Sequence, residues 1–118
     1  MRYLLLVQVD PASAGPAGPD DGLAERMGDL LADMSKASVL LDAAGLRPIE
    51  QATRIRLARG RQTVIDGPFA ESKEVIGGYC LLRANSKHEA TQWAARFLAL
   101  HGPEWTMGIE IRELEDPA

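Results

Sequence analysis

Two stretches of the chain repeat apolar residues at helical spacing, and each lies between segments that alternate like strands. The first helix, expected after Asp20 or Asp21 as its cap, has a stripe formed by Leu23, Met27, Leu30, Leu31 and Met34. The second, capped by Ser86 with Glu89 three residues on, has a stripe formed by Ala90, Trp93, Ala94, Phe97 and Leu98. Because each helix has one apolar stripe, the pair can cover one face of one sheet. The pattern predicts an α+β fold.

The strand-like segments give the order β-α-β-hairpin-β-α-β. The expected strands are residues 2–9, 39–41, 77–83 and 107–112, and the hairpin pairs residues 52–58, expected to be a half-buried strand, with residues 62–66. This order is that of a ferredoxin-like sandwich with a β-hairpin insertion. With 118 residues we expect a single domain over residues 1–118. Residues 10–21, rich in Pro, Ala and Gly, are predicted to be a flexible loop, and residues 43–48 a turn.

Apolar residues on both faces of the expected sheet predict a homodimer. Tyr3 and Leu5 fall on one face of the first strand, and Leu4 and Leu6 fall on the other. Since two helices cover only one face, the economical cover for the second face is the same face of another copy, packed sheet to sheet.

Charge and residue types narrow the classes of function. Thirteen Lys and Arg against 17 Asp and Glu give a formal net charge of −4, which disfavours general attraction to nucleic acid or to a membrane surface. The one cysteine, Cys80, excludes an internal disulfide, favours a reducing, cytoplasmic compartment, and is predicted to be an inert buried thiol. With only His88 and His101 besides, we expect no metal and no cofactor. The apolar run of residues 3–7 is too short for a signal peptide or a membrane span.

The stretch Asp66-Gly67-Pro68-Phe69-Ala70-Glu71-Ser72-Lys73-Glu74, followed by Gly77-Gly78-Tyr79, resembles the signature of the DGPF-domain proteins of the YCII-related superfamily. The start Arg2-Tyr3-Leu4-Leu5-Leu6 and the later Ala90-x-x-Trp93-Ala94 also fit that family, so the resemblance spans the chain. It implies a dimeric α/β barrel of ferredoxin-like protomers. Some DGPF members accompany extracytoplasmic-function sigma factors. Some YCII relatives are similar to small lyases with a His-Asp pair, but the first helix here has no histidine for that pair.

The signature holds the candidate catalytic residues Asp66, Glu71 and Lys73. Two carboxylates in one poorly solvated site raise the pKa of one of them, which can then act as an acid, and Lys73 can hold an anionic group. The alternative is a rigid turn, in which Asp66 accepts hydrogen bonds from the N–H groups that follow and Phe69 anchors the loop in the core. The candidates for a ligand cleft are Gln8, Asp66, Phe69, Glu71, Lys73 and Tyr79.

Five arginines lie between Arg47 and Arg61, with Glu50 opposing them. Such a patch can meet phosphate or an acidic partner. No aromatic residues are interleaved, so we predict no specific binding of nucleic acid and favour a solvated, charged hairpin that resists aggregation.

Two classes of function stay open. The favoured one is a homodimeric, cytoplasmic binding or regulatory protein, whose further partner is a sigma factor or a small-molecule ligand. The alternative is a small cofactor-free enzyme with lyase-like acid/base chemistry and a pocket at the Asp66 loop. The lack of a recognisable base with an orienting partner favours the first class, and the carboxylates of Asp66, Glu71 and Glu74 favour the second.

Overall fold

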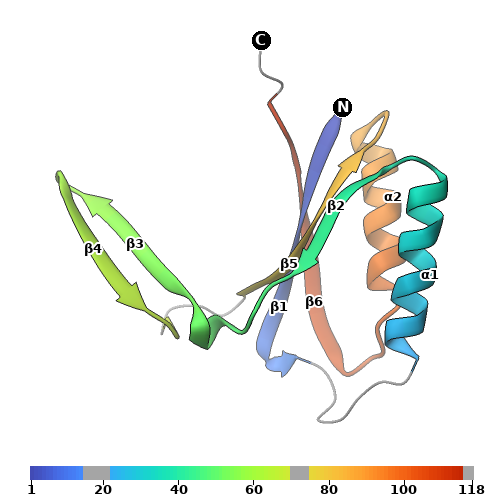
Figure 1. Cartoon of the computed structure of the whole chain (residues 1–118). Helices are drawn as coiled ribbons and strands as arrows, with labels where there is room; N and C mark the ends of the chain where they lie inside the picture. Colours follow the sequence, from blue (N-terminus) through green and yellow to red (C-terminus); the bar gives the residue numbers. More distant parts are fainter. Residues whose placement is uncertain (15–21, 70–74, 116–118) are drawn as a thin grey trace.

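The computed structural model of the chain describes residues 1–14, 22–69 and 75–115. In chain order the elements are β1 (Arg2–Ala14), α1 (Leu23–Lys36), β2 (Leu40–Gly45), the short 3₁₀ helix η1 (Ile49–Gln51), β3 (Thr53–Ala58), β4 (Arg61–Asp66), β5 (Val75–Arg83), α2 (Lys87–Leu98) and β6 (Trp105–Glu113). Figure 1 shows both α-helices on one side of the main sheet and the β3–β4 hairpin projecting from the other side.

The main sheet has four strands in the order β2-β5-β1-β6, and every neighbouring pair is antiparallel. With two helices on one face, this arrangement confirms the predicted α+β class and is compatible with a ferredoxin-like fold. The predicted hairpin insertion is the separate two-stranded sheet β3–β4. Several predicted boundaries shift, most of all in two places. β1 runs on to Ala14, into the predicted flexible loop, whose residues 15–21 lie outside the described residues, and β2 includes Ala43 and Gly45, where a turn was expected. Pairing of Ala43 with Cys80 extends β2, because a neighbouring strand overrides weak local preference.

The register separates the two faces of the sheet. Leu5 lies opposite Cys80 on β5 and Ile111 on β6, and these side chains face the helices. The buried core on that face consists of Tyr3, Leu5, Leu30, Met34, Val39, Leu82, Ala84, Ala90 and Ala94. Leu30 and Met34 come from the first predicted stripe, and Ala90 and Ala94 from the second. The helical periodicity therefore located the core correctly.

The other face of the main sheet, called the open face here, is also apolar at its centre. Leu6 lies opposite Tyr79, and Leu4 lies opposite Leu81. Ile76, opposite Gln8, is 44% exposed. Both helices lie on the opposite side (Figure 1), so they leave this face uncovered.

The two helices begin differently. Ser86 Oγ accepts a hydrogen bond from the Glu89 N–H at 3.1 Å, and Glu89 Oε2 accepts one from the Asn85 N–H at 2.9 Å, so α2 starts with the predicted capping box, displaced by one residue on its return bond. At α1 the N-cap residue is Gly22, and the predicted caps Asp20 and Asp21 lie outside the described residues.

The hairpin β3–β4, residues 53–66, is called the arm. Its register places Ile55 and Leu57 on the same face as Val64, and the arginines on the other face, as the alternation predicted. The turn at its tip uses positive φ angles at Arg59 (53°) and Gly60 (77°), which suit the twist of a two-residue hairpin loop. Every residue of both strands is exposed, so the prediction that residues 52–58 are a half-buried strand was wrong for the single chain.

Candidate functional site: an apolar cavity under the helices

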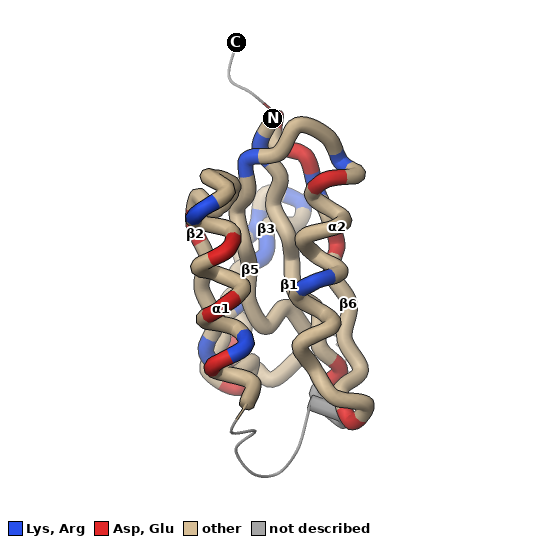
Figure 2. Tube along the Cα trace, turned by 90° about the vertical axis from the view of Figure 1, so that its right-hand side faces the viewer, with Lys and Arg blue, Asp and Glu red and all other residues tan. Residues whose placement is uncertain are grey.

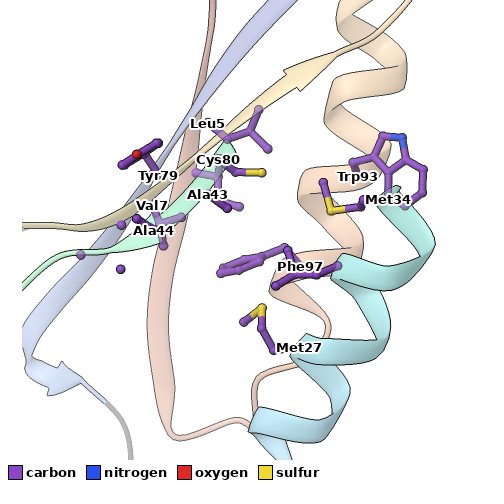
Figure 3. Close-up of a pocket in the computed structure, with 15 residues that line it drawn as sticks. Leu5, Val7, Met27, Met34, Ala43, Ala44, Tyr79, Cys80, Trp93 and Phe97 are labelled. Carbon is purple, nitrogen blue, oxygen red and sulfur yellow. The ribbon is translucent and has the colours of Figure 1, made fainter. Parts of the chain in front are cut away.

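A cavity of about 350 Å³ lies between the main sheet and the two helices (Figure 3). The helices line it with Met27, Leu31 and Met34 of α1 and Trp93 and Phe97 of α2. The sheet lines it with Leu5, Val7, Ala43, Cys80 and Ile109. All of these side chains are apolar or carry only sulfur or an indole as a polar group. The cavity therefore offers dispersion and hydrophobic contact rather than charge.

Small residues on β2 and β5 leave space on the side of the cavity that the sheet forms. Gly45, Gly77 and Gly78 line it without side chains. Gly78 is also required by packing, because a Cβ there would lie 2.9 Å from the carbonyl oxygen of Ala44 on the neighbouring strand. The sheet side of the cavity therefore has no side chains at these positions, because β2 and β5 approach closely. The long Met and Phe side chains of the helices line the opposite side of the cavity.

Two polar contacts tie α1 to α2, which together form the roof. Arg26 donates from Nε and Nη2 to the Leu100 carbonyl oxygen at 3.1 and 2.8 Å, and so binds a carbonyl just beyond the end of α2. Arg96 Nη2 lies 2.7 Å from Asp33 Oδ2, with both side chains about half exposed. Exposed ion pairs of this kind contribute about 0–1 kcal/mol. The roof is held by modest interactions and can adjust to an occupant.

Cys80 supplies the one thiol beside the cavity. Burial raises its pKa to about 11, and the negative charge of Asp42 adds to the rise. At neutral pH the side chain is therefore a protonated, weakly polar thiol, which supports the predicted inertness. It is only partly buried, less than the sequence suggested.

His101 packs just past the end of α2. Its ring lies between Phe97 and Trp105, with ring centroids 5.2 Å apart in each pair. Its Nδ1 is 3.1 Å from the Phe97 carbonyl oxygen. These contacts fix the ring against the helix that forms one end of the roof.

The described part of the signature loop, residues 66–69, lies at the base of the arm, and none of these residues lines the cavity. Asp66 is exposed, and its Oδ1 accepts a hydrogen bond from Thr53 Oγ1 at 2.9 Å across the hairpin. The expectation that Phe69 anchors the loop in the core was wrong, because its ring lies beneath the Arg54 guanidinium, 3.9 Å from it. That cation–π contact joins the loop to the arm. Glu71 and Lys73 lie outside the described residues.

Gln8 and Tyr79, the other cleft candidates, lie on the open face. The Tyr79 O–H donates to Asp42 Oδ2 at 2.8 Å, and this bond to an acceptor raises the pKa of Tyr79 above its ordinary value. Tyr79 borders the cavity only through its main chain, and its ring points away from the helices (Figure 3). The structure thus divides the described candidates between the open face and the arm.

Comparison with known proteins places the chain in a family. A family model of the YCII-related domain matches residues 1–116. The chain belongs to the YCII-related family. The resemblance inferred from the signature is therefore confirmed at the level of the superfamily. The chain is also 38% identical, over 79 residues, to an uncharacterised protein of Rhizobium meliloti (strain 1021), and the match covers 67% of this chain and 62% of that relative.

Within the described residues, the YCII-related chain has no helix that is both long and apolar enough to cross a membrane. The cavity itself was not predicted. Its signals in the sequence are the Gly77-Gly78 pair and the spacing of Met27 and Met34, and both patterns equally suit an ordinary packed core.

The raised pKa of Cys80 predicts slow alkylation in the folded protein. A rise from 9.0 to about 11 lowers the thiolate fraction near neutral pH about 100-fold. Iodoacetamide at pH 7.5 should therefore label the native thiol about 100-fold more slowly than the thiol in urea, and the native rate should climb until about pH 11. Mass spectrometry follows the labelling. Equal rates in the native and unfolded chains would contradict the assigned environment.

Proposed function

We propose that this protein binds a small, uncharged and largely apolar molecule in the cavity between its sheet and its helices. The observation that carries the proposal is a partly open cavity of about 350 Å³ whose described lining is predominantly apolar. That volume lies within the range of small-molecule sites, which are mostly apolar with few polar groups. Thiol and thioether sulfurs and aromatic edges favour a flat, polarisable ligand over a charged one.

Binding fits this cavity better than acid/base catalysis. The ionisable side chain that faces it, Cys80, stays protonated near neutral pH, because its pKa is raised to about 11. The alternative, a small cofactor-free enzyme, places its chemistry at the Asp66 loop. There the one described carboxylate is exposed and already accepts a hydrogen bond from Thr53, which is the geometry of a structural contact.

We further propose that the binding protein is a homodimer with its open faces packed sheet to sheet, as a closed α/β barrel. The apolar centre of that face, formed by Leu4, Leu6 and Leu81, supports this arrangement. Light scattering at micromolar concentration should give twice the chain mass of 12.8 kDa. A species at the mass of one chain would contradict the dimer.

A cytoplasmic location and a regulatory role belong to the same proposal. The single cysteine supports a reducing compartment. Association with an extracytoplasmic-function sigma factor, which the family resemblance implies for some members, stays a prediction. A ligand-dependent change in binding to such a factor would give the cavity a regulatory use.

The test of ligand binding uses N-phenyl-1-naphthylamine, a neutral fluorophore that brightens in apolar sites. Ala43 lies on the edge strand β2 and faces the cavity, so Ala43→Leu narrows it. We expect this variant to weaken binding at least about 10-fold, because methylenes in the cavity displace ligand atoms and their contacts. Fluorescence titration of the full chain measures the dissociation constant.

Ala95→Leu makes the same chemical change on the exposed surface of α2, away from the lining residues. It should leave the dissociation constant within about twofold. Equal losses in the two variants, or none in either, would show that the probe binds elsewhere and would remove the support for this site. Loss of binding in an Asp66→Ala variant with Ala43→Leu unaffected would move the proposal to the signature loop.

A further inference from the structure

The arm carries a continuous apolar face that nothing in the described part of the chain covers. Ile55 is 63% exposed, Leu57 68% and Val64 63%, and the hairpin register places all three on one face. Single exposed aliphatic residues are ordinary, but three together on one face of a two-stranded sheet form a patch that favours burial. A two-stranded hairpin is also marginally stable without further packing.

The arm stands away from the rest of the molecule. Figure 1 shows it projecting on the side of the main sheet opposite the helices, which is the side of the open face. The radius of gyration is 16.2 Å, whereas a compact chain of this length has about 13–14 Å. Open face and arm therefore border one concave region, into which a second body can fit.

The charge of the arm indicates which molecule fits into this concave region. Four arginines and Asp66 give residues 53–66 a net charge of +3, so the rest of the 118-residue chain carries −7. Figure 2 shows Asp and Glu along α1 and α2, with the basic arm behind the sheet. The arm as a whole is thus opposite in charge to the body of another copy, which favours their approach, while its arginines lie on the face away from the apolar contact. Pairing of two arms would bring two charges of +3 together.

We propose that the arm clasps the second copy of the chain. In the homodimer of the proposed function, on which this inference rests, the apolar face of each arm packs against the body of the partner that occupies the open face. The clasp is isologous: each chain gives an arm and receives one. The two main sheets, packed against each other, form the centre of the dimer. The two arms contribute most of the affinity between the chains.

Two neighbouring residues test the clasp. Val64 lies on the apolar face and Ile65 on the arginine face, 63% and 45% exposed respectively. Because both are exposed in the single chain, neither Val64→Ser nor Ile65→Ser removes core packing. We expect Val64→Ser to raise the dimer dissociation constant at least about 10-fold, since the loss occurs twice per dimer, and Ile65→Ser to change it less than about threefold. Sedimentation equilibrium measures both.

Each outcome decides a different claim. Equal effects of the two variants in a wild type that dimerises would overturn the clasp and leave the sheet-to-sheet dimer standing. A monomeric wild type at micromolar concentration would overturn both. A second measurement distinguishes arm-to-body from arm-to-arm packing: in a Cys80→Ser background, Gln62→Cys, which lies opposite Leu57 on the apolar face near the tip, should give no disulfide-linked dimer on mild oxidation. A linked dimer would place the arms against each other and overturn the proposal.

Discussion

Leu82→Ala is expected to lower the free energy of unfolding by about 2–5 kcal/mol. Leu82 is fully buried, at 0% exposure, at the centre of the helix-facing core, where it lies opposite Tyr3 on β1 and Leu40 on β2. Truncation removes buried methyl groups and leaves a void that a close-packed sheet cannot fill by collapsing. Urea denaturation followed by circular dichroism measures the loss.

A volume-conserving change at the same position provides the comparison. Leu82→Met keeps most of the buried apolar area, so we expect a cost below about 1.5 kcal/mol. If Leu82→Ala cost no more than Leu82→Met, the core would not be where the register of β1 and β5 places it.

Gly67→Ala should be the second most damaging change, with a cost of about 1–3 kcal/mol. A Cβ at this position would collide with the carbonyl oxygen of Ile49 and lie 3.2 Å from that of Ala52. Both are main-chain atoms, so η1 and the base of the arm must shift. The Gly67 N–H also donates to the Ala52 carbonyl oxygen at 2.8 Å, and that bond would be strained.

The readout for Gly67→Ala is urea denaturation together with tryptic cleavage, because the arm contains four arginines that report its opening. We expect cleavage within the arm to accelerate. Gly28→Ala is the matched change: a Cβ there meets nothing within 4 Å, and α1 should gain up to about 1 kcal/mol from the better helix former. Unchanged stability and unchanged cleavage in Gly67→Ala would contradict the contact between the signature loop and η1.

The periodicity of apolar residues in the sequence was sufficient to predict the layers of this fold. The stripes of α1 and α2 depend on one face of each helix being buried, and that requirement leaves a direct trace in residue order. The Ser86 cap was also predictable, because the residues that take part in it lie within four positions of one another. Gly22 as the N-cap residue of α1 was not, because glycine has no side chain that marks a cap in the sequence.

The candidate site could not be predicted from such patterns in the sequence. Whether Met27 and Met34 fill a core or line a cavity depends on the spacing between a helix and a sheet, which is set by residues far apart in the chain such as Ala43 and Phe97. Likewise, alternation correctly gave the two faces of the arm, but burial of Ile55 and Leu57 depends on what packs against them. The signature loop drew attention to Asp66 by its sequence alone, and only the position of Thr53 reveals the hydrogen bond that it accepts.

The methyl groups of the methionines test the central claim, that the cavity is the ligand site. The chain has 4 methionines, of which Met27 and Met34 line the cavity, whereas Met1 and Met107 are not among its lining residues. Titration of ¹³C-methyl-methionine-labelled protein with N-phenyl-1-naphthylamine should shift the Met27 and Met34 signals through the ring current of the probe and leave Met1 and Met107 nearly unchanged. Shifts confined to Met1 or Met107, or saturable probe binding with no shift at Met27 and Met34, would contradict the account.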